Sequence, residues 1–321
     1  MNDLKGPVNR RALGGIQVHP LIREFESARS AATPSLPALG ELWLEVKRLR
    51  IHCLKAGSRD HPVLLLHGGG LDAAGLSFRT TIPVLAEQHC VFAPDWPGFG
   101  HSDPMPMSWR VEECVDFVGE ILDALDLKRV SLVGVSMGGA FALGFTLRAP
   151  ERIDRLVLVD SAGMGNDIPG GLLSYLTMRL PLLDELRWTF MVGNRTLARR
   201  ILCAALVNCN QVLTEEMLDE IILLARQAGA GAAFRQLQRS EYQWHGLRTN
   251  YLPQLSEVKI PTLLVHGAED GIVPVSWAER AHHLIKNSKI EVIPRCGHLP
   301  PVENPGLFNR IVEDFLLDQR D

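Results

Sequence analysis

The sequence has few of the features that mark a nucleic-acid-binding or membrane protein. Lys and Arg number 33 against 37 Asp and Glu, which gives a net charge of −4, and no run of basic residues exceeds two. Because binding to a phosphate backbone needs a clustered excess of basic side chains, we expect no nucleic-acid partner. No apolar run approaches the roughly 20 residues that cross a bilayer, so we expect no membrane span.

The chain also lacks the residue spacings of metal sites and disulfide frameworks. Its six cysteines, at positions 53, 90, 114, 203, 209 and 296, form no CxxC pair, and no HExxH motif occurs. We therefore expect no metal and no cofactor, and we interpret the cysteines as reduced thiols of a cytoplasmic protein. The first thirty residues carry acids and bases throughout, which argues against a secretory signal.

What the chain does contain is a regular alternation of apolar strands and amphipathic helices. The strands expected in "PVLLLHGGG", "RVSLVGVS" and "IDRLVLVDSAG" are apolar on both faces, whereas residues 109–126 place apolar side chains at helical spacing. This alternation predicts an α/β fold with a mostly parallel central sheet and helices on both faces.

The alternation stops near residue 166 and resumes near residue 251. The intervening segment has helical patterns rich in Leu, Met and Arg, and no convincing strand. We predict a core at 41–165 and 251–321, and a helical lid (cap) at 166–250 over the carboxyl edge of the sheet, where such sheets bind ligands. Residues 1–40 are expected to form an N-terminal extension, partly helical at 19–30.

A serine stands at one of the predicted strand-to-helix junctions. In "LVGVSMGG", Gly134 and Gly138 flank Ser136 at two residues' distance on either side. A sharp turn there exposes the hydroxyl above the sheet edge, and its strained backbone needs neighbours without a Cβ atom. We predict Ser136 as a nucleophile and the Met137 backbone N–H as one donor of an oxyanion hole.

A serine nucleophile needs a base and an acid that orients the base. In "LLVHGAEDGIVP" Asp270 stands at the end of a strand, and in "VIPRCGHLPPVENP" His298 follows the last strand, so both are expected at the carboxyl edge. The order Ser, Asp, His predicts a catalytic triad. Asp160, which closes "LVLVD", is the strongest rival for the acid, and Glu269 is a lesser one.

The second oxyanion donor is expected from the glycines after "LLLH". Gly69 is our choice, and Gly68 and Gly70 stay open as alternatives. His67 and His266, each before a glycine at a strand end, are interpreted as braces of their loops.

With these residues assembled, the chain resembles the lid-bearing branch of the α/β-hydrolase superfamily, which includes esterases, lactonases and carbon–carbon bond hydrolases. The resemblance covers residues 42–160 and 258–318, through "LLLHGGG", "APDWPGFGHSD", "LVGVSMGG", "LVLVDSAG", "PTLLVHGAEDGIVP" and "CGHLPPVENP". It implies Ser136 as nucleophile, Asp270 as acid and His298 as base, and it implies a structural turn at Asp95. Haloalkane dehalogenases and epoxide hydrolases of this fold carry Asp where this chain has Ser136.

We expect a serine hydrolase that cleaves a small or medium carboxylic ester or lactone through an acyl-enzyme on Ser136. The Leu- and Met-rich lid predicts a small-molecule substrate with an apolar portion. The oligomeric state, monomer or homodimer, stays open.

An alternative is a carbon–carbon bond hydrolase of a ring-fission-type vinylogous diketone acid. Its substrate carboxylate needs a cation, for which Arg179, Arg187 and Arg195 of the lid are candidates. Many ring-fission hydrolases carry "HGGGPG" and a Trp beside the base, where this chain has "HGGGLD" and Leu299. A non-catalytic binder of the same fold is a further alternative.

Overall fold

The computed structural model describes residues 39–318, apart from 169–170, 179, 208 and 228. The helix expected at 19–30 and nearly all of the extension expected at 1–40 lie outside these residues.

A central sheet of eight strands organises the described part of the chain, in the order β1-β2-β4-β3-β5-β6-β9-β10. β1 pairs antiparallel with β2, and β2 with β4, whereas all other neighbours are parallel. The predicted mostly parallel sheet is therefore confirmed. The strands are β1 (Gly40–Val46), β2 (Leu49–Ala56), β3 (Pro62–Leu66), β4 (Cys90–Pro94), β5 (Val130–Val135), β6 (Ile153–Val159), β9 (Thr262–Gly267) and β10 (Ser288–Ile293).

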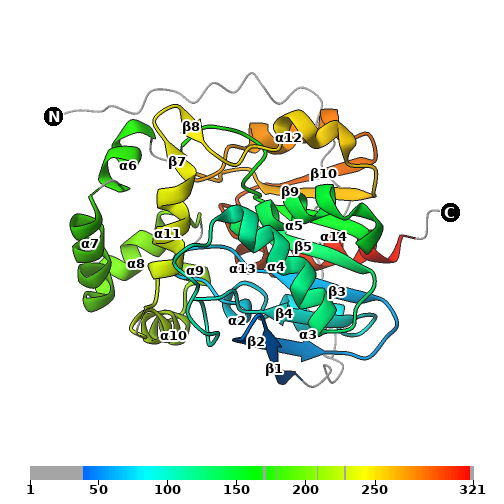
Figure 1. Ribbon diagram of the computed structural model, residues 1–321, viewed down its shortest axis with the longest axis horizontal. Helices are drawn as coiled ribbons and strands as arrows, with labels where there is room; N and C mark the ends of the chain where they lie inside the picture. Colours follow the sequence, from blue (N-terminus) through cyan, green and yellow to red (C-terminus); the bar gives the residue numbers. More distant parts are fainter. Residues whose placement is uncertain (1–38, 169–170, 179, 208, 228, 319–321) are drawn as a thin grey trace. The chain divides into compact units, whose positions relative to one another are not determined.

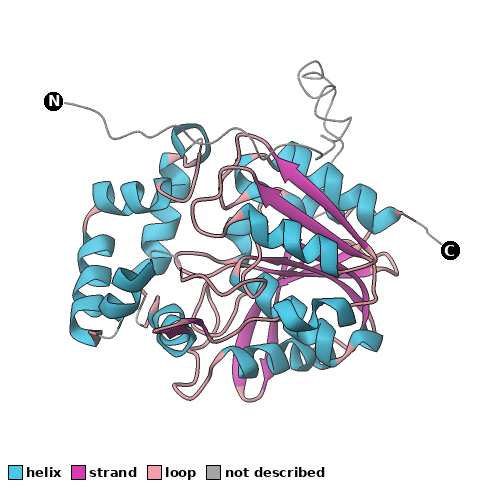
Figure 2. Ribbon diagram, turned by 90° about the horizontal axis from the view of Figure 1, so that it is seen from above, coloured by secondary structure: helices cyan, strands magenta, loops and turns pink. Residues whose placement is uncertain are grey.

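Helices cover both faces of the sheet (Figures 1 and 2). On one side α3 packs against α14, and on the other α4 packs against α5. α5 is apolar on nearly every side and is correspondingly buried along most of its length, directly behind the central strands. The bounds are α2 (Ala74–Ser77), α3 (Thr81–Leu85), α4 (Val111–Ala124), α5 (Met137–Arg148), η1 (Pro150–Arg152), η2 (Leu252–Glu257), α12 (Val275–Leu284), α13 (Pro300–Glu303) and α14 (Pro305–Leu317).

Between β6 and β9 the chain leaves the sheet and forms a group of helices, which we call the helical insertion (Figure 1). Its members are α6 (Gly171–Met178), α7 (Pro181–Gly193), α8 (Arg195–Cys203), α9 (Cys209–Val212), α10 (Glu215–Ala225) and α11 (Ala232–Glu241). The insertion has a small apolar core of its own, which packs on Ala73 and Leu76 of the sheet domain. It ends in a short hairpin, β7 (Tyr242–Gln243) and β8 (Gly246–Leu247), so the expectation of no strand in this segment is wrong.

One expectation about the cysteines is also wrong. Cys203 at the end of α8 and Cys209 at the start of α9 form a disulfide, with their Cα atoms 5.1 Å apart. The turn between the two helices brings the sulfurs together, which residue spacing alone does not reveal. The other four cysteines are free, and Cys296 is fully buried.

None of the helices in the described ranges is both long and apolar enough to cross a membrane.

Candidate active site

Ser136 lies at the tip of the turn between β5 and α5, with φ 51° and ψ −112°. This backbone geometry is unfavourable for a residue with a side chain, and it holds the hydroxyl clear of the sheet. A Cβ atom added to Gly134 would lie 2.5 Å from the carbonyl oxygen of Gly138, and one on Gly138 would collide with the carbonyl of Leu66. Both flanking glycines are thus required by the close passage of α5 over the sheet edge, as the sequence predicts.

The structure brings Ser136 together with the two residues expected to activate it. His298 Nε2 lies 2.9 Å from Ser136 Oγ, and His298 Nδ1 lies 2.8 Å from Asp270 Oδ2. Because the carboxylate accepts the Nδ1 proton, Nε2 is left to accept a hydrogen bond from the serine hydroxyl. This is the arrangement in which an imidazole can remove the serine proton.

Asp270 is fixed in place by its own loop. Its Oδ1 accepts hydrogen bonds from the backbone N–H groups of Ile272, at 2.7 Å, and Val273, at 3.1 Å. Burial alone would raise the pKa of Asp270, but the hydrogen bond from His298, the electrostatic attraction of that ring and the two backbone donors outweigh burial and hold that pKa below its usual value. The carboxylate therefore stays charged where it faces the imidazole.

The two rival acids occupy different positions. Glu269 is exposed and lies beside Asp270 in the chain without joining its hydrogen bonds. Asp160 is completely buried next to Asp270, and its Oδ1 accepts the backbone N–H of Gly267 at 2.9 Å. Asp160, Asp270 and His298 form the one group of three potential metal ligands found in the described part of the chain, with their nearest donor atoms within 4.8 Å. Since His298 Nδ1–H is already donated to Asp270, this geometry favours a hydrogen-bonded triad over an ion site.

Of the oxyanion donors expected from the sequence, Gly69 lines the same cavity as Ser136, and Met137 is the next residue in the chain. The Gly68 N–H is donated to Asp72 Oδ2 at 2.8 Å, which removes it as a free donor. Within the described residues the Gly69 N–H is donated to no other group, and Met137 is the first residue of α5, where helix N–H groups lack an internal partner. The geometry thus favours Gly69 over Gly68.

Two histidines brace loops around the site, as the sequence suggests. The Nδ1–H of His67 is donated to the carbonyl of Gly68 at 2.8 Å, and Nε2 accepts the Trp96 N–H at 3.1 Å. His266 Nε2–H is donated to the carbonyl of Val273 at 3.0 Å. Each ring is thus hydrogen-bonded to its own loop.

Asp95 has the structural role that the resemblance implies. Its side chain accepts hydrogen bonds from His52 Nδ1 at 2.8 Å, from the Ala74 N–H at 2.9 Å and from the His101 N–H at 3.0 Å. These bonds tie β2, α2 and the loop after β4 into one unit.

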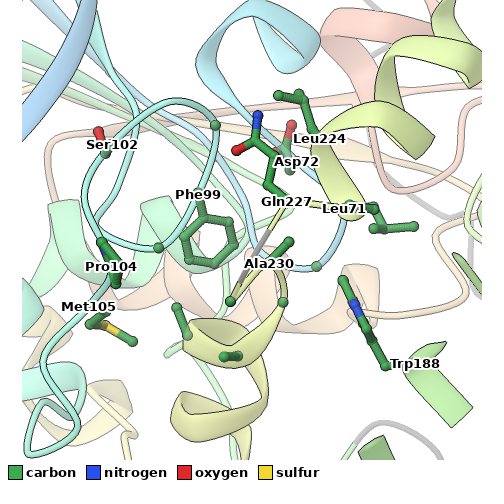
Figure 3. A pocket seen from close by; sticks show the side chains of 18 of the residues that line it. Leu71, Asp72, Phe99, Ser102, Pro104, Met105, Trp188, Leu224, Gln227 and Ala230 are labelled. Carbon is green, nitrogen blue, oxygen red and sulfur yellow. The ribbon is translucent and has the colours of Figure 1, made fainter. Parts of the chain in front are cut away.

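The reactive groups open into a cavity of about 410 Å³ between the sheet edge and the helical insertion. Ser136 and His298 lie in its wall, and its other lining is mostly apolar: Leu71, Leu76, Met191, Ile201, Leu202, Leu206, Leu213, Met217, Ile221, Phe234 and Leu299. A second cavity of about 310 Å³ adjoins it and shares Leu71, Asp72 and Trp188 (Figure 3). The site therefore suits a substrate with apolar bulk.

The cations proposed for a substrate carboxylate are not placed as expected. Arg195 lies away from the cavity and pairs with Glu215 and Asp219. Arg179 and the side chain of Arg187 lie outside what the structure describes.

Sequence reasoning missed Arg235 of α11, which does line the larger cavity. Its guanidinium pairs with Glu185 at 2.9 Å and lies over the Trp188 ring at 4.9 Å. It is only 5% exposed, although an arginine in an isolated helix pattern is usually solvated. Helical register alone gave no signal for it, because its burial comes from α7 packing across α11.

A loop of the insertion also contacts the base directly. The residues between the disulfide-bonded Cys203 and Cys209, which we call the disulfide loop, place the Ala205 carbonyl 2.9 Å from the His298 N–H. Val207 N–H is donated to Glu303, whose other oxygen accepts the N–H of Gly297. His298 is thus held from the insertion as well as from the sheet.

The fold and the turn at Ser136 define an α/β hydrolase, and comparison with known proteins agrees. Residues 61–305 match the family model described as alpha/beta hydrolase fold, and the chain belongs to this family. It is similar to 2-hydroxy-6-oxo-2,4-heptadienoate hydrolase of Pseudomonas putida, with 31% identity over 83% of this chain and 91% of the relative. It is also similar to 2-hydroxy-6-oxo-6-phenylhexa-2,4-dienoate hydrolase of Burkholderia cepacia, with 32% identity over 84% and 92%.

A solved structure gives the same fold. The meta-cleavage product hydrolase of Pseudomonas fluorescens IP01 superposes with a TM-score of 0.72 at 28% identity, covering 86% of this chain and 97% of that one.

Proposed function

We propose that the protein is a serine hydrolase that cleaves a carbon–carbon bond in an acid of the 2-hydroxy-6-oxo-dienoate class. The observation that carries the substrate class is the set of curated relatives, which are hydrolases of such acids and match over more than four fifths of the chain. They support the alternative of the sequence analysis better than the ester or lactone hydrolase expected first.

In the proposed reaction His298 takes the proton of Ser136 as its Oγ attacks the ketone carbon. The N–H groups of Gly69 and Met137 receive the resulting oxyanion. The form that is attacked is the diketone tautomer, in which the proton of the 2-hydroxyl group has moved to carbon 5 and carbon 2 is a carbonyl. As the carbonyl at carbon 6 re-forms, the bond between carbons 5 and 6 breaks, and its electron pair is conjugated through the remaining double bond with the carbonyl at carbon 2. That carbanion takes the proton from His298. Water, deprotonated by His298, then releases the acyl group from Ser136, and Asp270 stabilises the imidazolium in each half.

Arg235 supports this reading, since it is the described cation in the wall of the reactive cavity. A substrate carboxylate would pair with the guanidinium of Arg235, which also pairs with Glu185. We propose further that the helical insertion acts as the lid, with the core at 41–165 and 251–321 and the lid at 166–250.

Ester hydrolysis stays the second candidate because of the cavity's lining. Leu299 lies beside His298 in a wall that is mostly apolar, and the charge of Arg235 is already balanced by Glu185. An uncharged acyl chain would fit such a wall without a counter-ion.

One comparison tests both candidates. We expect the wild-type protein to turn over 2-hydroxy-6-oxo-6-phenylhexa-2,4-dienoate, followed by loss of its visible absorbance, with a higher kcat/KM than p-nitrophenyl butyrate. The reverse order would favour the esterase.

The nucleophile is tested by Ser136→Ala, which should lower kcat on either substrate on the order of 10⁴-fold, because the hydroxyl forms the covalent bond. Ser131→Ala, in the same strand β5 but away from the cavity, is the matched control and should retain activity. Full turnover by Ser136→Ala would rule out the assignment.

A further inference from the structure

Two carboxyl groups meet under the base histidine, although the proposed mechanism uses only one of them. The side chains of Asp160, at the end of β6, and Asp270, after β9, are both completely buried. Each has an oxygen within 4.8 Å of the other and of a His298 ring nitrogen. Asp160 also has φ 42°, in the left-handed region that residues other than glycine rarely adopt.

The charges around the pair do not balance two anions. His266 Nε2 lies 3.4 Å from Asp160 and 3.5 Å from Asp270, yet its proton goes to the Val273 carbonyl and burial lowers the pKa of this ring, so it is neutral. The titratable groups that face Asp160 are His266, Asp270, His298, Cys296 and Glu303. His298 is the other base among them, and its Nδ1–H is donated to Asp270.

The hydrogen bonds divide the two acids into different roles. Asp270 accepts from His298 and from two backbone N–H groups, all of which favour its charged form. Asp160 Oδ1 accepts a hydrogen bond from the Gly267 N–H, whereas Oδ2 accepts no hydrogen bond from any donor in the described residues. If Asp160 is protonated, its Oδ2–H group can donate a hydrogen bond, whereas an ionised Oδ2 would be a buried acceptor without a donor.

We propose that Asp160 is a positioning residue, held as a neutral carboxylic acid whose O–H is donated to Asp270 and so fixes the carboxylate that orients His298. Burial first, and the charge of Asp270 second, raise the pKa of Asp160 well above its usual value, which agrees with this protonation state. The role rests on the proposed function in one respect, namely that Asp270 orients the base.

The test compares Asp160→Asn with Asp160→Ala. The amide of Asn can donate to Asp270 and accept from Gly267, as the neutral acid does, whereas Ala can do neither. We expect Asp160→Asn to react with a fluorophosphonate probe within about twofold of the wild-type rate, and Asp160→Ala about tenfold more slowly, as for a lost hydrogen bond to a charged group.

A second measurement needs no catalysis. A buried acid that stays protonated binds a proton that the unfolded chain releases above about pH 4, so its contribution to the free energy of unfolding falls as pH rises from there. Because Asn does not titrate, Asp160→Asn removes this fall in the free energy of unfolding. The variant should therefore be more stable than wild type at pH 7, and the difference should shrink as the pH approaches about 4.

Either of two results would overturn the proposal. If Asp160→Asn reacts as slowly as Asp160→Ala, Asp160 works as an anion. If the stability difference between Asp160→Asn and wild type does not change between about pH 4 and pH 7, Asp160 is not held protonated. A wild-type protein that fails to react with the probe would instead contradict the proposed function, and the unfolding measurement would still decide the state of Asp160.

Discussion

At the scale of single residues, the pair formed by His52 and Asp95 shows how one buried contact can couple stability to pH. The hydrogen bond that His52 donates to Asp95 raises the pKa of His52 against the opposing effect of burial. The Asp95 side chain is 2% exposed and holds three segments of the chain together. The protonated form of the His52 ring is therefore more stable in the folded protein than in the unfolded chain.

The sign of this coupling gives a prediction. Because the folded pKa of His52 is raised, its contribution to stability is complete below about pH 6.5 and is lost as the pH rises through the folded value. His52→Gln should flatten the fall in the free energy of unfolding between pH 6 and 8, measured by urea titration. His283→Gln, on the partly exposed α12, is the control and should leave the slope unchanged. An identical slope in wild type and His52→Gln would contradict the assignment.

The residues of the proposed triad could be predicted because each stands at or within a few residues of the carboxyl end of a strand. Parallel strands end at one edge, so Ser136, Asp270 and His298 had to meet there. Arg235 and the contact between Asp160 and Asp270 could not be predicted. The first depends on contacts of the Arg235 side chain with Glu185 and Trp188 of α7. The second was not expected because the sequence offers Asp160 and Asp270 as alternatives for one role, not as a pair.

At the scale of elements, the disulfide loop is the feature that sequence reasoning read wrongly. It links α8 to α9 and carries the carbonyl that receives the His298 N–H. Without the covalent link, the short connection between these helices would have many more conformations in the unfolded chain.

We expect the unreduced, denatured protein to expose four thiols to Ellman's reagent and the reduced protein to expose six. Cys203→Ser should lower the free energy of unfolding by about 2 kcal/mol, because a loop this short closes at modest entropic cost.

Cys203→Ser should also slow phosphonate labelling of Ser136, because the disulfide loop holds the backbone of His298. Cys90→Ser, at the half-buried start of β4, is the matched control and should leave the labelling rate unchanged. Six thiols before reduction would show that the bond does not form.

At the scale of the whole described chain, two apolar cores of unequal size lie on the two sides of the cavity that holds Ser136 and His298. The larger lies against the sheet and α5, and the smaller lies within the helical insertion. Several large side chains of the insertion stay in contact with water, among them Leu173, 72% exposed, and Phe190, 66% exposed. The insertion therefore has less buried apolar area to resist local opening.

Hydrogen exchange should follow this division. Amides of β3, β5, β6 and β9 are expected to exchange slowest, and those of α7 and α10 markedly faster, measured by mass spectrometry of peptic fragments. Labelling Ser136 with a fluorophosphonate should slow exchange in α10, whose Ile221 lines the cavity, and should leave α12 unchanged. Equal protection in sheet and insertion would contradict the two-core description.

The bond between the Ala205 carbonyl and the His298 N–H has a kinetic consequence. A displacement of the disulfide loop would break this bond and remove one support from the backbone of the base. The rate at which His298 takes the proton of Ser136 therefore depends on the position of the helical insertion as well as on the sheet.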